Sequence, residues 1–141
     1  MFNTIVVGTD GSDTADKAVA RAVELARLTG ARLHVVSAYT PAAARVVGEP
    51  ASGEYSVGPD FKVDAVLSGT LDRLRAEGVE IEAHGPKGDP GDAIVEIAER
   101  EDADLIVLGS RGMQGARRIL GSVPNKVSHN APCDLLIVQT T

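Results

Sequence analysis

The length of 141 residues fits one domain of ordinary size and leaves no room for two. Aromatic residues make up 3% of the chain and the net charge is −6, which excludes a base-stacking platform and the dense basic face of a nucleic-acid-binding protein. The single cysteine, Cys133, excludes an internal disulfide and indicates a reducing compartment. No basic residue precedes the first apolar run, and no apolar run could cross a bilayer, so we expect a cytoplasmic protein with no membrane partner.

The first part of the chain alternates between strand and helix patterns. Residues 4–8 are apolar on both faces, which is typical of a buried parallel strand. A turn and N-cap sequence then precedes apolar residues at helical spacing from Ala15 to Ala26, and Gly30 is expected to end that helix. Residues 32–38 form the second predicted strand. Residues 40–60, with three prolines and three glycines, predict a long loop that acts as a lid or flap.

The second part repeats the alternation. Helical spacing returns over residues 63–74, and the alternating residues 79–83 predict a strand at the edge of the sheet. The remaining expected elements are a helix capped by Asp89 with Pro90 in its first turn, a very hydrophobic strand at 104–109, a short helix near 123–130 and a strand at 134–139. Five strands in this order predict an α/β fold: a doubly wound parallel sheet with helices on both faces.

In such a sheet, ligands bind beyond the carboxyl ends of the strands, where the strand order reverses. Glycine-rich loops follow the first and fourth predicted strands, at residues 8–12 and 109–112, and face each other if these strands are neighbours. Ser122 opens the helix after the second loop, where free N–H groups suit a phosphate; the alternative is that Ser122 is an ordinary N-cap. The P-loop and dinucleotide-binding fingerprints are both missing from the sequence.

Few other side chains suggest chemistry. Asp10 could hold a divalent ion against phosphates, or could bond its own loop in an Asx turn. Of the three arginines in the second loop region, we expect at most one to contact a ligand. The spacing of the histidines and Cys133 does not predict a zinc site, and no nucleophile elbow or Cys/His signature predicts a catalyst. At most, slow hydrolysis of a bound nucleotide is expected.

Motifs near both ends of the chain, in this combination and order, resemble the universal stress protein family. The resemblance covers essentially the whole chain, as one domain over residues 1–141. The segments that carry it are the opening strand and acidic loop Ile5–Ser12, the stretch Gly109–Gly112, the stretch Gly121–Val127 and the closing strand region Ala131–Val138.

The resemblance implies a five-stranded sheet in the order 3-2-1-4-5 and an ATP site with the signature G-2x-G-9x-G-[ST]. By this resemblance, Gly109, Gly112, Gly121 and Ser122 would line the ribose and phosphates, assisted by the backbone of Val123. Thr9 and Asp10 would lie beside the nucleotide, and Val35 and Leu108 would pack on the adenine. Arg111 is a further candidate, because a guanidinium is well shaped to bind a phosphate. ATP with Mg²⁺ or Mn²⁺ is the implied cofactor, with Asp10 the candidate metal ligand.

The spacing in this chain departs from the signature. Eight residues, not nine, separate Gly112 from Gly121. A tighter loop could favour one phosphate over three, so cyclic AMP is an alternative to ATP. We therefore expect a stress-response sensor or regulator that binds an adenine nucleotide. A slow ATPase or phosphotransferase and a nucleotide-free scaffold are the alternatives.

The last predicted strand also suggests a partner. Residues 135–138 are all apolar, and the implied strand order places them at the edge of the sheet. An uncovered apolar edge promotes association, and a second copy related by a twofold axis would cover it. The family resemblance implies a homodimer through this same strand.

Overall fold

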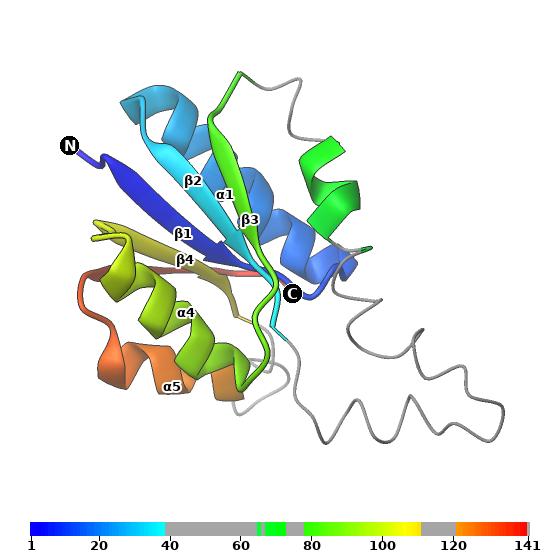
Figure 1. Ribbon diagram of the computed structural model, residues 1–141, viewed down its shortest axis with the longest axis vertical. Helices are drawn as coiled ribbons and strands as arrows, with labels where there is room; N and C mark the ends of the chain where they lie inside the picture. Colours follow the sequence, from blue (N-terminus) through cyan, green and yellow to red (C-terminus); the bar gives the residue numbers. More distant parts are fainter. Residues whose placement is uncertain (39–64, 66, 73–77, 111–120, 141) are drawn as a thin grey trace, which may run out of the picture.

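The computed structural model describes residues 1–38, 65, 67–72, 78–110 and 121–140 (Figure 1). These residues form a five-stranded parallel sheet in the order β3-β2-β1-β4-β5, which confirms the predicted fold class and strand order. The strands are β1 (Thr4–Gly8), β2 (Arg32–Val36), β3 (Ile81–His84), β4 (Leu105–Gly109) and β5 (Asp134–Val138). The helices with defined bounds are α1 (Asp13–Thr29), α4 (Pro90–Arg100) and α5 (Ser122–Asn130).

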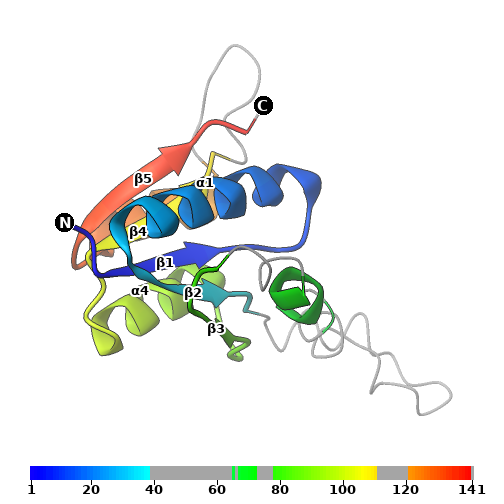
Figure 2. The same ribbon diagram turned by 90° about the horizontal axis from the view of Figure 1, so that it is seen from above.

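Helices cover both faces of the sheet (Figures 1 and 2). Along β1, Ile5 and Val7 pack on α1, while Val6 packs on the opposite side with residues of α4 and α5. Successive side chains of a strand point to opposite faces, so a strand buried on both sides must be apolar at every position. The apolar run at residues 4–8 therefore reflects the central place of β1 in the sheet.

Three of the predicted helix boundaries are confirmed in detail. Ser12 caps α1, with its Oγ accepting a hydrogen bond of 3.2 Å from the backbone N–H of Ala15, and the helix ends at Gly30. Gly30 has φ of 73°, a left-handed conformation that glycine adopts without steric cost. Asp89 caps α4 in the predicted manner, accepting a bond of 3.0 Å from the N–H of Asp92, with Pro90 as the first helical residue.

Other boundaries differ from the predictions. The N-cap of α5 is Gly121, so Ser122 is the first residue of that helix and does not cap it. The second strand ends at Val36, two residues earlier than expected, because its neighbour β3 ends at His84, whose carbonyl accepts the last bond from the N–H of Ser37.

The predicted strand at 79–83 is observed at Ile81–His84, and it lies at the sheet edge as expected. Residues 67–72 are helical, within the predicted 63–74 helix, and Leu67 joins the apolar cluster on the α1 side. The expected flap at 40–60 lies outside the described residues. Within the described part of the chain, none of the helices has the length and apolar character needed to span a bilayer.

Hydrogen bonds to the Asp104 side chain connect the start of β1 with the start of β4. Its carboxylate accepts hydrogen bonds from the backbone N–H groups of Asn3 (2.7 Å) and Thr4 (3.0 Å), which lower the pKa of Asp104.

Since this pKa is lower in the folded protein, we expect Asp104 to stabilise the fold above its unfolded pKa near 3.8 and to lose that contribution as the pH falls below it. Chemical denaturation at pH 7 and pH 3 will show a smaller acid-induced loss of stability in Asp104→Asn than in the unchanged protein. Equal losses would contradict this role.

Candidate functional site

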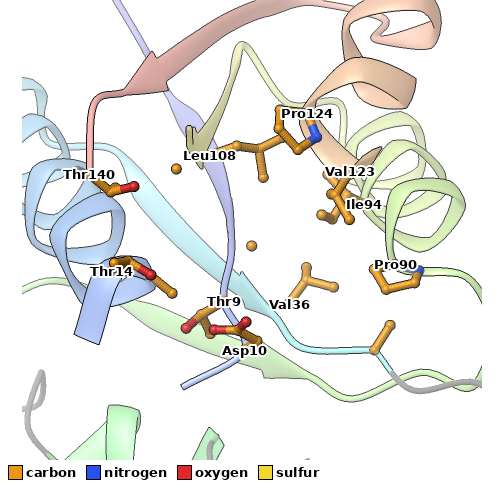
Figure 3. A pocket seen from close by; sticks show the side chains of 14 residues that line it. Thr9, Asp10, Thr14, Val36, Pro90, Ile94, Leu108, Val123, Pro124 and Thr140 are labelled. Carbon is orange, nitrogen blue, oxygen red and sulfur yellow. The ribbon is translucent and has the colours of Figure 1, made fainter. Parts of the chain in front are cut away.

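A cavity of about 290 Å³ lies beyond the carboxyl ends of the strands (Figure 3). The exits of β1, β2, β4 and β5 and the first turns of α1, α4 and α5 all contribute to it, which is the place where a doubly wound fold holds a ligand. The lining residues are Gly8, Thr9, Asp10, Thr14, Ala15, Val36, Ala38, Pro90, Ile94, Leu108, Gly109, Val123, Pro124 and Thr140.

The cavity has two chemically different sides (Figure 3). Thr9, Asp10, Thr14 and Thr140 lie on one side, and their side chains carry the polar atoms. The opposite side is aliphatic and comes from the ends of β2 and β4 and the first turns of α4 and α5; its members are Val36, Pro90, Ile94, Leu108, Val123 and Pro124. The site can therefore hold a molecule with a flat apolar part and a separate set of hydroxyl or charged groups.

The loop after β1 is held by its own side chains. The hydroxyl of Thr9 accepts a bond of 3.0 Å from the N–H of Gly11, and the Asp10 carboxylate accepts one of 2.9 Å from the N–H of Ser12. The second bond is the Asx turn that was one of the two expectations for Asp10. Because this turn fixes the exposed carboxylate at the mouth of the cavity, Asp10 has both a structural role and a position beside any ligand bound there.

Close packing shapes the floor of the cavity at Gly8. A β-carbon at this position would lie 2.7 Å from Cδ1 of Ile94 and 3.0 Å from Cδ2 of Leu108. Both contacts are shorter than van der Waals distance, so any larger residue would push these two lining side chains outward. Glycine at this position allows the aliphatic wall to close over the end of β1.

The ends of β4 and β5 are joined by hydrogen bonds, and one buried hydroxyl beside them has no partner in the described part of the chain. Ser110 donates its N–H to the carbonyl of Val138 (2.9 Å), and its Oγ accepts a bond of 3.1 Å from the N–H of Thr140. Thr140 is 2% exposed, and its own Oγ1 has no hydrogen-bond partner among the described residues. Buried hydroxyls are normally bonded, and Thr140 lines the cavity, so a ligand or water there would supply the missing partner (Figure 3).

The N-terminus of α5 offers backbone donors beside the same cavity. The N-cap Gly121 has no side chain to occupy the N–H groups of the first turn, whereas Ser12 and Asp89 cap α1 and α4. Uncapped N–H groups and the positive end of the helix dipole favour an anion. Val123 and Pro124 of this first turn line the cavity, so an anionic group in the cavity would lie close to the helix end.

The structure brings five of the predicted site residues together at the cavity: Thr9, Asp10, Leu108, Gly109 and Val123. Gly121 and Ser122 adjoin Val123 at the start of α5 without lining the cavity themselves. Arg111 and Gly112 lie outside the described residues.

Val35, expected beside the adenine, is fully buried in the apolar cluster on the α1 side. Its neighbour Val36 faces the cavity instead, because consecutive strand residues point to opposite faces.

Several lining residues were not predicted. Thr14, Ala15, Pro90, Ile94 and Pro124 come from the first two turns of their helices, which in this fold begin at the ligand edge of the sheet. That rule, applied to the predicted helix starts, would have identified them. Ala38 and Thr140 follow the last residues of β2 and β5, where the same rule applies to strand ends.

Cys133 does not contribute to this cavity. It is half-buried and packs against the apolar cluster on the α4 side, which agrees with a small core residue. Burial, with a smaller contribution from Asp134, raises the pKa of its thiol. A raised pKa disfavours the reactive thiolate.

Comparisons with known proteins agree with this fold. A model of the universal stress protein family matches residues 1–139. Universal stress protein Rv1636 of Mycobacterium tuberculosis is 40% identical over 144 residues, covering 99% of this chain and 98% of the relative.

Two solved structures of similar proteins contain nucleotides. A universal stress protein in complex with cAMP is 38% identical, with a TM-score of 0.77 and 99% of each chain covered. A universal stress protein of Archaeoglobus fulgidus in complex with dAMP is 29% identical, with a TM-score of 0.72, covering 96% of this chain and 97% of that one. With its strand order, its full-length family match and relatives such as these, the chain belongs to the universal stress protein family.

Proposed function

We propose that this protein binds an adenine nucleotide in the cavity beyond β1 and β4. The observation that carries the proposal is the combination around one cavity of an aliphatic wall, an uncapped helix N-terminus and the Thr140 hydroxyl, which has no hydrogen-bond partner among the described residues. Each element matches one part of a nucleotide: the base, the phosphate and a ribose or phosphate oxygen. The cAMP and dAMP complexes of similar proteins support the same class of ligand.

The base would lie on aliphatic side chains such as Val36 and Leu108, because none of the described residues that line the cavity is aromatic. Aliphatic contact gives adenine an apolar surface without strong stacking, so the phosphate contacts are expected to contribute much of the affinity. Those contacts would come from Ser122, the N–H of Val123 and the predicted residues Gly109, Arg111, Gly112 and Gly121. Thr9 and Asp10 would bind the sugar or a phosphate-bound Mg²⁺ or Mn²⁺ ion.

ATP and cyclic AMP are the two specific candidates. The glycine signature favours ATP, whereas the eight-residue spacing between Gly112 and Gly121 favours a ligand with one phosphate. The two nucleotides in the similar structures, cAMP and dAMP, also have one phosphate. The spacing and these complexes together make cyclic AMP a candidate equal to ATP.

An absorbance scan and a competition titration test the proposal. With two tyrosines and no tryptophan, the protein absorbs weakly, so a co-purified adenine would dominate the ultraviolet spectrum and leave with the filtrate after denaturation. Calorimetric titration of nucleotide-free protein with ATP, in the absence and presence of cyclic AMP, then ranks the two. Binding of either nucleotide supports the proposal, and the tighter one identifies the ligand. Absence of heat and of a thermal shift with both would overturn it and favour the scaffold alternative.

The wider role follows from ligand binding. We propose one cytoplasmic domain that acts in a stress response as a sensor or regulator, in which nucleotide occupancy changes the surface that a partner contacts. A slow ATPase or phosphotransferase would depend on water and metal positioned by Asp10. Phosphate release above the blank that disappears in Asp10→Ala would support that alternative.

We also propose that the protein is a homodimer through β5. This strand lies at the edge of the sheet, and Leu135, Leu136 and Ile137 remain half-buried in the single chain. Edge pairing with a second copy would satisfy its outer backbone groups and cover these side chains. Light scattering is expected to give twice the mass of the chain, and a monomer at micromolar concentration would contradict the dimer.

A further inference from the structure

Three side chains with metal-binding atoms meet on the β2–β3 edge of the sheet, and none of them lines the proposed nucleotide cavity. His34 lies on β2, and Glu82 and His84 lie on β3. His34 is the direct register partner of Glu82, while His84 is two residues further along β3, so all three side chains share one face. These are the residues among the described part of the chain whose ligand atoms come within 4.8 Å of one another.

Two of the distances between these atoms are close to those expected around one ion. Nδ1 of His34 lies 2.9 Å from Nε2 of His84, and the same Nε2 lies 3.4 Å from Oε2 of Glu82. Zn²⁺ binds imidazole nitrogen and carboxylate oxygen at about 2.0–2.1 Å, which places neighbouring ligands of a tetrahedral site roughly 3.3 Å apart. The two distances between the side-chain atoms, 2.9 Å and 3.4 Å, lie on either side of this value.

The carboxylate of Glu101 lies near the ring nitrogen of His34 that does not face the cluster. The other ring nitrogen of His34, Nε2, is buried without a hydrogen-bond partner among the described residues, and Oε1 of Glu101 is 3.8 Å away at the end of α4. Metal-bound histidines usually donate their second N–H to a carboxylate or carbonyl, which fixes the ring and increases its basicity. If Nδ1 of His34 binds a metal, Nε2 must carry the proton, and a small movement of Glu101 would accept it.

The surrounding charges permit a cation. Arg100 is ion-paired with Glu101 at 3.4 Å, and Arg32 is ion-paired with Glu80 at 2.6 Å, so each cation has an acidic neighbour. Burial, and then the neighbouring His34, lower the pKa of His84, which favours the neutral ring that a metal ion binds. Glu82 adds the negative charge that favours a divalent ion.

An ion and its water could reach the cluster from solvent. His84 forms part of the wall of a surface hollow of about 520 Å³ between the β3–α4 connection and α4. The side chain of Glu82 is 61% exposed, whereas that of His34 is 1% exposed. The cluster thus has one rigid buried ligand and an open side, as in three-ligand sites that complete their coordination with water.

We propose that Nδ1 of His34, Nε2 of His84 and the Glu82 carboxylate form a binding site for Zn²⁺ or a similar divalent transition-metal ion, with water as the fourth ligand. Glu101 positions His34 through Nε2. Imidazole and carboxylate ligands suit Zn²⁺ and its neighbours better than Mg²⁺ or Ca²⁺, which prefer oxygen ligands alone. The bound ion would join the short edge strand β3 to β2. The site is independent of the proposed nucleotide cavity.

Calorimetric titration of the untagged, chelator-treated protein with Zn²⁺ at pH 7.5 tests this site. We expect one Zn²⁺ per chain. His84→Gln and Glu82→Gln are expected to weaken binding at least about 10-fold, and Glu101→Gln about 10-fold through the orientation of His34. His129→Gln is the matched control, because His129 is the third histidine of the chain and is exposed at the end of α5. Cys133→Ser is also expected to bind Zn²⁺ normally.

Co²⁺ provides a readout that does not depend on stability. A tetrahedral Co²⁺ spectrum is expected in the unchanged protein, in His129→Gln and in Glu101→Gln, and its loss is expected in His84→Gln. His84 and Glu82 carry the test because His34 is buried and its replacement could impair folding. Absence of Zn²⁺ binding, or equal binding by His84→Gln and His129→Gln, would overturn the site and leave His34 and His84 as a hydrogen-bonded pair.

Discussion

We expect Leu33→Ala to lower the free energy of unfolding by about 2–5 kcal/mol, which is a large part of the stability of a domain of this size. Leu33 is fully buried on β2, between β1 and β3, in the cluster that packs on α1. Truncation removes its transfer free energy and leaves a cavity that neighbours on adjacent strands cannot easily fill. Urea denaturation followed by circular dichroism measures the change.

Leu28→Ala is the matched control for this substitution. Leu28 is 79% exposed near the end of α1, so the same chemical change there should alter stability by less than about 0.5 kcal/mol. The comparison separates burial from side-chain type. Similar losses in the two variants would contradict the assignment of Leu33 to the core.

We expect Ser122→Asp to weaken nucleotide binding about 10-fold or more while leaving the fold intact or slightly more stable. Ser122 is exposed in the first turn of α5, where a carboxylate interacts favourably with the helix dipole by about 0.3–1 kcal/mol. The same charge would repel a phosphate bound at this helix end. Affinity and stability should therefore change in opposite directions, and calorimetry and thermal unfolding measure the two.

Two comparisons isolate the charge. Ser122→Asn has nearly the same size as Ser122→Asp without the charge, so it should bind the nucleotide much more tightly than the aspartate variant. Adenosine lacks a phosphate, so its affinity should be the same in both variants. If Ser122→Asp binds adenosine and the nucleotide with equally reduced affinity, the phosphate does not lie at α5.

The strands of the sheet could be predicted from the sequence, because a run of consecutive apolar residues indicates a strand that is buried on both faces. Residues 4–8 and 104–109 are apolar at nearly every position, which occurs when both faces of a strand are covered. Asp89 and Gly30 were recognisable because capping needs particular side-chain or backbone chemistry within one turn. Such local rules do not depend on the rest of the chain.

The candidate sites were less predictable, because they depend on which face a residue occupies. Val35 and Val36 are the same residue type, and their assignment to the α1 cluster or to the cavity depends on the phase of β2. Likewise, His34 and His84 are 50 residues apart, and no metal-binding spacing connects them. The pairing register of β2 with β3 brings them together, so combining the strand order with the side-chain alternation would have revealed the pair.

A calorimetric titration of Ala15→Phe, beside Ala20→Phe and the unchanged protein, tests the cavity as the nucleotide site most directly. Both alanines lie on α1, but Ala15 lines the cavity and Ala20 is exposed. A phenyl ring at Ala15 would occupy space needed by the ligand, so we predict affinity reduced about 100-fold or more in Ala15→Phe and unchanged in Ala20→Phe. Equal affinity for cyclic AMP or ATP in all three proteins would contradict the account.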